Sequence, residues 1–223
     1  MSNLAIAMLC PIDDGPYLGT AFSVSEYLVV CAFHSIGDRK TCKVIHDNVK
    51  LRWLGGDLMS RAKYAAGDCP LDYALYELQP PLPTGYDLQP LGIAEHPPAG
   101  EGFRSAGFPQ ALQGSVVMPS VQGSVTGYDA RLQGDVPAIQ LYCEESATQL
   151  SLRGFSGAPV IVGDDLALGV IRWNPPLPEN PEYGQGGLVY ATSMSMILQK
   201  RPLFFRDVKV YTPSQWFGKT RWF

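Results

Sequence analysis

The chain has 223 residues, of which 46% are hydrophobic and 17% are charged, and its formal net charge is −4. This composition is too apolar and too weakly charged for a disordered chain, and the length suits one large domain or two small ones. Glycine (23) and proline (19) are frequent, and no apolar run approaches the roughly 18 residues that a membrane-spanning helix needs. Coiled coils, long helical bundles and transmembrane bundles are therefore excluded, and an all-β sandwich or barrel is favoured.

The charge is unevenly distributed along the chain. Residues 200–223 hold six basic residues and one acid, so of the 17 basic and 21 acidic residues, 11 and 20 lie in the first 199. The body therefore has a net charge of −9 and the tail one of +5. An acidic body is not typical of a nucleic-acid-binding protein, so we expect neither nucleic acid nor a membrane as a partner.

The number and spacing of the cysteines indicate the cellular compartment of the protein. There are five, at positions 10, 31, 42, 69 and 143, with no CxxC pair. An odd number without paired spacing argues against a zinc site and against a disulfide framework. The apolar N-terminal stretch lacks a basic region and runs into Asp13 and Asp14, which is unlike a signal peptide. We therefore expect a reducing, cytoplasmic location.

The predicted elements are short β-rich segments, separated by turn residues at roughly even intervals, as in sandwiches and barrels. Proline clusters at 80–83 and 97–98 predict a boundary between two halves, and 193–199 is the best helix candidate. The predicted strands are 20–24, 28–32, 43–45, 49–53, 73–78, 103–106, 115–117, 123–128, 138–142, 159–162, 167–173 and 188–191.

Three of these segments carry residue types used in catalysis. His34 comes just past the end of a predicted strand, Asp72 opens a strand, and Ser156 lies between Gly154 and Gly157. Taken singly, each has a commoner structural interpretation: a core or surface histidine, a turn aspartate and a glycine-rich turn. The glycines nevertheless permit a tight turn that exposes the serine and aligns neighbouring N–H groups, as an oxyanion requires.

Together, the segments resemble three motifs of the trypsin/chymotrypsin-like serine peptidases. They are Ala32-Phe33-His34, Asp72-Tyr73-Ala74-Leu75 and Gly154-Phe155-Ser156-Gly157-Ala158-Pro159-Val160, in the family's chain order. Residues 169–174 and 187–191 are similar to the strand that lines the family's specificity pocket and the strand behind it. The chain also resembles the bacterial intracellular trypsin-like peptidase domains of this family.

The resemblance covers about residues 15–200 and implies a fold. That fold consists of two antiparallel six-stranded Greek-key β-barrels, chymotrypsin-like, with a short C-terminal helix and tail. The implied peptidase domain is 1–200, with one barrel at about 15–90 and the other at about 100–192. Residues 201–223 then form a basic aromatic tail, or a junction to a partner or a further domain.

The resemblance also implies roles for the site residues. Ser156 attacks a peptide carbonyl, His34 accepts and returns its proton, and Asp72 orients His34 and stabilises the imidazolium. The N–H groups of Gly154 and Ser156 form the oxyanion hole. Neither a metal nor another cofactor is required.

Chain order excludes the nearest alternative chemistry. In an α/β-hydrolase the acid and the histidine follow the serine, whereas His34, His46 and His96 all precede Ser156. A cysteine nucleophile is disfavoured because Cys31 lies three residues before His34, and a strand turns such positions to opposite faces.

Three positions depart from the pattern of secreted family members. Ser35 and Leu152 stand where those members often carry disulfide cysteines. Phe155 stands where zymogen-activated members carry an acid that pairs with a newly cut N-terminus. We therefore expect an intracellular enzyme whose activity is built in or is controlled by a partner or fused domain.

The resemblance places five candidate substrate-binding residues around the specificity pocket. Leu150 would form its floor, with Leu188 nearby, Trp173 on a wall, Asn174 at the rim and Arg172 on the same strand. An apolar floor offers no counter-charge for lysine or arginine, so cleavage after uncharged, apolar residues is expected. In the alternative interpretation Leu150 belongs to the core and the pocket is partly closed.

The tail and the peptidase fold each leave alternatives. Aromatic and basic residues are interspersed in 201–223, a pattern that favours packing on the acidic body or docking to a protein partner over nucleic acid or membrane binding.

The predicted enzyme is an intracellular serine endopeptidase. Its resemblance to bacterial intracellular domains implies a regulated effector of defence or signalling. The alternatives are a catalytically silent module that binds a peptide or partner protein, and a structural domain.

Overall fold

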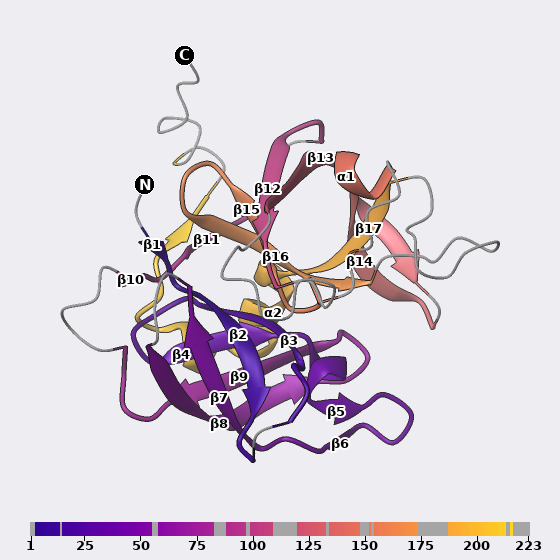
Figure 1. Cartoon of the computed structure of the whole chain (residues 1–223). Coiled ribbons are helices and arrows are strands. Elements are labelled where there is room, and N and C mark those ends of the chain that lie inside the picture. Colours follow the sequence, from indigo (N-terminus) through magenta and orange to yellow (C-terminus); the bar gives the residue numbers. More distant parts are fainter. Residues whose placement is uncertain are drawn as a thin grey trace.

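Two β-barrels, one above the other in Figure 1, make up the computed structural model of the chain. The N-terminal half forms the lower, indigo-to-magenta barrel, and the C-terminal half forms the upper one. The structure describes residues 3–13, 15–54, 58–82, 88–96, 99–108, 120–132, 134–147, 152, 154–173, 187–212 and 215.

The first barrel is closed and consists of six antiparallel strands in the order β2-β3-β4-β9-β8-β7. Every second side chain of a strand points into the barrel interior. In β7, Val49, Leu51 and Trp53 are buried while Asn48 and Arg52 are exposed. The Trp53 indole N–H donates to the Ser60 hydroxyl over 2.7 Å, which satisfies its polar end inside the barrel. The strands are β2 (Ile6–Pro11), β3 (Gly19–Ser23), β4 (Leu28–Cys31), β7 (Asn48–Trp53), β8 (Met59–Asp68) and β9 (Tyr73–Leu78).

The second barrel is built from six strands in the order β12-β13-β14-β17-β16-β15, and β15 pairs with both β16 and β12. The set therefore returns on itself. Phe103, Leu141, Phe155 and Leu168 are among the side chains that fill it. The strands are β12 (Gly102–Ala106), β13 (Ser120–Leu132), β14 (Val136–Cys143), β15 (Pro159–Val162), β16 (Leu166–Trp173) and β17 (Leu188–Ser193).

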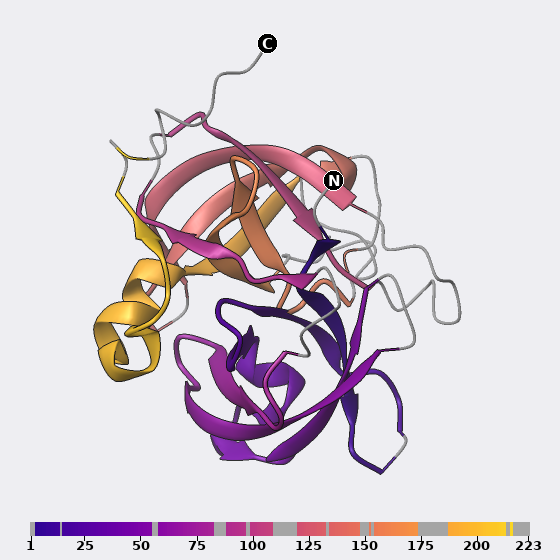
Figure 2. The same ribbon diagram turned by 90° about the vertical axis from the view of Figure 1, so that its left-hand side faces the viewer.

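The junction of the barrels is a third buried cluster, to which both barrels contribute. Helix α2 (Met194–Lys200) and the 3-10 helix η3 (Pro202–Phe205) cover it, and Figure 2 shows them in yellow beside the junction. The cluster includes Ile6, Phe22, Val30, Leu75, Ile93, Ile161, Val170, Met194, Ile197 and Phe205. This burial fixes one barrel against the other, which is what a site between them requires.

Short elements complete the fold. Strand β11 (Gly92–Ala94), which follows the first barrel, runs parallel to both β16 and β18 (Val210–Tyr211) and so ties the C-terminal segment to the second barrel. No helix among the described residues is both long and apolar enough to span a membrane. The remaining elements are β1 (Asn3–Leu4), η1 (Phe33–Ser35), β5 (Gly37–Asp38), β6 (Lys43–Val44), β10 (Leu88–Gln89) and α1 (Glu144–Ala147).

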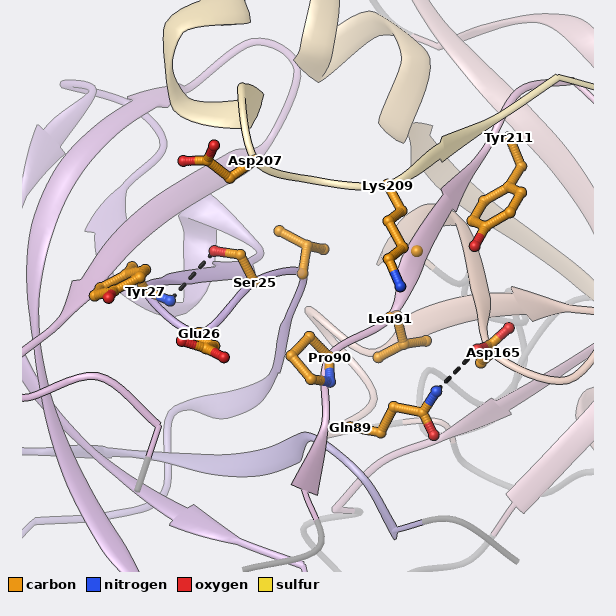
Figure 3. Close-up of a pocket in the computed structure, with 12 residues that line it drawn as sticks. Ser25, Glu26, Tyr27, Gln89, Pro90, Leu91, Asp165, Asp207, Lys209 and Tyr211 are labelled. Carbon is orange, nitrogen blue, oxygen red and sulfur yellow. Dashed lines mark hydrogen bonds between the residues drawn. The ribbon is translucent and has the colours of Figure 1, made fainter. Parts of the chain in front are cut away.

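A cavity of about 450 Å³ lies at the edge of the junction (Figure 3). The turn Ser25–Tyr27, the linker Gln89–Gly92 and the C-terminal segment Asp207–Tyr211 line it. Its charged groups are of both signs, with the Lys209 ammonium among the carboxylates of Glu26, Asp165 and Asp207. The Gln89 side-chain amide donates a hydrogen bond to the Asp165 carboxylate over 3.1 Å.

The structure confirms the all-β class and the short helix near the end, and it extends the predicted first barrel. Strand β2 begins at Ile6, before the boundary expected at about residue 15. Strand β8 was also missed, because its sequence MSRAKYAAGD is poor in β-branched residues; pairing with β7 and β9 on both sides overrides that local preference. The strand predicted at 115–117 lies outside the described residues.

One expectation from the cysteines is wrong. Cys42 and Cys69, 27 residues apart, form a disulfide with a Cα–Cα distance of 5.5 Å, whereas the odd count argued against a disulfide framework. An odd total does not exclude one pair; Cys10, Cys31 and Cys143 are not part of a disulfide. A cross-link closing a loop of this length stabilises a fold by about 3 kcal/mol. The cytoplasmic location, inferred partly from the cysteines, stays a prediction.

Candidate active site

His34 is held just beyond the end of a buried strand. Strand β4 ends at Cys31, Ala32 is extended, and the chain then makes the single turn of η1. Phe33 and Ser35, on either side of the histidine, are buried, whereas the His34 side chain is 27% exposed. The neighbours therefore anchor the turn in the barrel while the imidazole keeps an accessible edge.

Asp72 lies in the turn that joins β8 to β9, and its side chain is only 1% exposed. It has a positive φ of 58°, which is unfavourable for a residue with a side chain. The turn is fixed by hydrogen bonds from the Asp72 N–H to the Cys69 carbonyl, over 3.1 Å, and from the Thr192 hydroxyl to the Leu71 carbonyl. The strained conformation aims the carboxylate at His34.

The Asp72 carboxylate accepts two kinds of hydrogen bond from His34. Its Oδ1 accepts the backbone N–H over 2.9 Å, and its Oδ2 lies 2.8 Å from the ring Nδ1. Because a carboxylate only accepts, Nδ1 carries the proton, and Nε2 is left as an acceptor. This tautomer is the one that a general base needs.

Arg39 also reaches this carboxylate. Its Nη2 donates to Asp72 Oδ2 in an ion pair, while the Arg39 side chain remains 46% exposed. Burial would raise the pKa of Asp72, but the His34 hydrogen bonds and the charges of His34 and Arg39 outweigh it and hold the pKa below its usual range. Asp72 is therefore ionised at neutral pH.

The glycine-rich loop that carries Ser156 docks on the first barrel. The Ser156 carbonyl accepts the Thr20 N–H over 2.8 Å, and the Gly154 carbonyl accepts the hydroxyls of Thr20 and Tyr17 over 2.9 and 2.7 Å. A Cβ at Gly157, where φ is 86°, would lie 2.1 Å from the Thr20 carbonyl oxygen and 2.9 Å from the Ala32 nitrogen. Only glycine allows this approach. The contact brings the serine segment against the segment that leads into His34.

Alternate amides in the serine loop differ in their hydrogen bonds. Phe155 N–H donates to the Leu152 carbonyl, and Gly157 N–H donates to the Ile171 carbonyl, over 3.0 and 2.8 Å. The N–H groups of Gly154 and Ser156 have no acceptor within the described part of the chain. Two N–H donors without a described acceptor, one on Ser156 itself and one two residues before it, are the arrangement that stabilises an oxyanion.

The buried thiol of Cys31 does not compete as a nucleophile. It is fully buried, and burial together with the charge of Asp72 raises its pKa far above the usual range. The thiol therefore stays protonated. Burial, and not the expected strand geometry, accounts for this, because β4 ends at Cys31 and His34 lies in η1.

The predicted specificity residues are only partly described. Leu150 and Asn174 lie outside the described residues, as does the side chain of Trp173. Leu188 begins β17 and is partly buried. Arg172 lies on β16, as expected. Its guanidinium donates to the Pro70 carbonyl over 3.1 Å and to the Thr192 hydroxyl over 3.5 Å, at the junction of the barrels.

Sequence reasoning missed Arg39, Thr20 and Tyr17. Arg39 lies in a loop with no recognisable pattern, and nothing in the sequence indicates that it turns back to Asp72. Thr20 and Tyr17 precede or begin a strand, where they look like ordinary strand and turn residues; their partner, Gly154, is more than 130 positions away in the chain.

Comparison with solved structures places the fold. The active form of the Rv3671c protease from M. tuberculosis superimposes with a TM-score of 0.63 at 17% identity, covering 90% of this chain and 81% of that chain. The HtrA-type protease AlgW, solved with a decapeptide, gives a TM-score of 0.67 at 14% identity, covering 92% and 66%. No family model matches the sequence, and no curated protein sequence does. The chain therefore has the trypsin/chymotrypsin-like two-barrel fold.

The Arg39–Asp72 ion pair predicts how acid unfolds the protein. Ionised Asp72 stabilises the fold above its unfolded-state pKa of about 3.9, and this stability is lost as the pH falls through the lower pKa of the folded state. In Arg39→Gln the folded-state pKa rises toward the ordinary value, so the unfolding midpoint should move to higher pH. A half-exposed pair is worth about 0.2–1 kcal/mol, which corresponds to a few tenths of a pH unit.

Circular dichroism during acid titration measures this midpoint. Arg61→Gln, which removes an exposed positive charge from the same barrel, is the matched control. Equal midpoints for the two variants would show that Arg39 does not hold Asp72 ionised.

Proposed function

We propose that this protein is a serine endopeptidase with Ser156 as nucleophile, His34 as general base and Asp72 as the residue that orients His34. One observation carries the proposal: the buried Asp72 carboxylate holds His34 through Nδ1, and the loop bearing Ser156 docks two residues before that histidine. Solved proteases with the same fold, at 14% and 17% identity, support it. AlgW was solved with a decapeptide, which supports a peptide or protein substrate here.

The reaction follows from the protonation states. Ser156 Oγ forms a bond to the scissile carbonyl carbon as its proton passes to His34 Nε2. The N–H groups of Gly154 and Ser156 donate to the oxygen that becomes negative. His34 then gives the proton to the leaving amine as the C–N bond breaks, which leaves an acyl-enzyme. Water then attacks the acyl carbon as its proton passes to His34, and His34 returns that proton to Ser156 Oγ as the ester bond breaks. No cofactor enters this sequence.

Asp72 contributes through its charge and its fixed position. Its low pKa keeps it ionised throughout, so it stabilises the imidazolium that forms at His34 in both steps. Because it is 1% exposed, water does not screen this interaction. The Arg39 guanidinium forms an ion pair with the same carboxylate oxygen, Oδ2, that contacts His34 Nδ1.

We also propose that activity does not require cleavage of the chain. Phe155, directly before the serine, is fully buried in the second barrel, where it packs close to Gly107. Its N–H donates to Leu152, and its carbonyl accepts the Ala158 N–H over 2.8 Å. Burial of the apolar Phe155 side chain therefore fixes the serine loop. In zymogen-activated members of the family, an ion pair with a newly cut N-terminus is needed at this position. Control by a partner or fused domain, as in a regulated effector, is compatible with this loop.

One prediction of the proposed function concerns the nucleophile, Ser156. Uncleaved protein should react with a fluorophosphonate to give a single adduct, because the activated Ser156 hydroxyl displaces fluoride. Ser156→Ala should abolish the adduct and lower kcat by roughly 10⁶. Intact-mass spectrometry and a fluorogenic peptide assay measure the two effects.

Ser120→Ala is the matched control, since Ser120 is exposed on β13. It should label like the unmodified protein. Equal labelling of Ser156→Ala would contradict the proposal, and a correctly folded protein without labelling or hydrolysis would favour the silent peptide-binding module.

The second prediction concerns the residue before the scissile bond. If Leu150 forms the floor of the primary pocket, no counter-charge is present there, and cleavage should follow uncharged apolar residues. Sequencing the products of a random peptide library gives the profile. A profile dominated by arginine or lysine would refute this specificity and leave the triad unaffected.

A further inference from the structure

We propose that the groove beside Asp72 is a subsite that binds an acidic side chain of the peptide substrate. The groove has a volume of about 680 Å³ and lies between the barrels. Arg39 and the Cys42–Cys69 disulfide line it from the first barrel; Arg172 and the tip of the β13–β14 hairpin line it from the second. The inference extends the proposed peptidase activity because it names the substrate class of the same site.

The charged groups of the groove leave an excess of positive charge. Its lining contains two guanidinium groups and, among the described residues, no acid. Asp72, behind the groove, already binds His34 and Arg39. Asp68 is held by Lys200 at 2.9 Å. Asp135, at the hairpin tip, is 84% exposed and pairs with Arg131 at 3.8 Å. One Asp72 carboxylate thus faces two arginines.

Arg172 is the less compensated of the two arginines. It is only 7% exposed, and its Nε–H is buried without an acceptor in the part of the chain that the structure describes. The groups that accept its hydrogen bonds among the described residues, the Pro70 carbonyl and the Thr192 hydroxyl, are neutral. Burial lowers the pKa of this guanidinium, although the charges of Asp72 and Asp68 act in the opposite direction. A carboxylate entering the groove would supply a direct ion pair, which Arg172 lacks among the described residues.

Arg39 is the arginine that a substrate carboxylate can reach from solvent. One part of its guanidinium binds Asp72, and the side chain remains 46% exposed at the wall of the groove. A planar group with five N–H donors can bind Asp72 and a second carboxylate at the same time. An acidic side chain lying between Arg39 and Arg172 would therefore meet one accessible and one buried cation.

The groove is within reach of a substrate that is being cut. Asp72 contacts both His34 and Arg39, so only one side chain separates the groove from the general base. An extended peptide advances about 3.3 Å per residue. A peptide whose scissile bond is at Ser156 therefore places residues two to four positions away near this groove. The −9 body repels acidic peptides at long range, so the preference is local.

The test measures binding without catalysis. Ser156→Ala protein labelled with ¹⁵N is titrated with peptides that are identical except for Glu or Gln at positions two to four before the scissile bond. The Glu peptide should bind on the order of tenfold more tightly, as charge-assisted hydrogen bonds do relative to neutral ones. It should also shift the Arg172 Nε–H resonance, which the Gln peptide should leave in place.

Variants assign the preference to the groove. Added to Ser156→Ala, Arg172→Met and Arg39→Gln should each reduce the Glu/Gln affinity ratio toward one, while Arg61→Gln should leave the ratio unchanged. If Arg172→Met fails to fold, Arg39→Gln decides, because its side chain is half exposed. Equal affinities for both peptides, no binding of either, or a ratio unchanged in both variants would overturn the subsite. If the Glu preference is found in a protein that hydrolyses nothing, the subsite stands and the proposed peptidase activity fails.

Discussion

A buried carboxylate must be paired, and much of this site follows from how Asp72 is paired. Its side chain is almost completely enclosed between the barrels, where an unpartnered charge would be strongly unfavourable. The backbone N–H and ring of His34 and the guanidinium of Arg39 meet this need. The same contacts fix the histidine tautomer and its ring orientation. The stability of the turn and the chemistry proposed for His34 therefore rest on one group.

The second requirement is that two barrels meet closely enough to bring distant residues together. The loop at Gly154–Gly157 does this through backbone contacts with Thr20 and Ala32, in which a side chain at Gly157 would not fit. The buried cluster at the junction holds the barrels in that relation, and Phe155 anchors the loop in the second core. Packing far from the reacting atoms thus sets the geometry at the serine.

The sequence was informative where a residue type has few alternatives. Gly154 and Gly157, which have positive φ in the structure, and the β-rich segments indicated the serine loop and the all-β class. The resemblance of the three motifs to the trypsin/chymotrypsin-like peptidases implied which elements meet. Strands β2 and β8 were missed because their local composition is ambiguous and pairing on both edges decides them. Arg39 and the Cys42–Cys69 pair were missed because both depend on how loops fold back, which periodicity does not encode. Arg172 was placed on the correct strand, but the direction of its guanidinium depends on Pro70 and Thr192, which are remote in the chain.

The proposed function requires Ser156, His34 and the amides of Gly154 and Ser156 to form one reaction centre. A crystal structure of the protein after reaction with a peptidyl phosphonate tests this requirement. We expect a bond from Ser156 Oγ to phosphorus, with a phosphonyl oxygen about 2.7–3.1 Å from the amide nitrogens of both Gly154 and Ser156. An adduct on another residue, or an oxygen directed away from these amides, would contradict it.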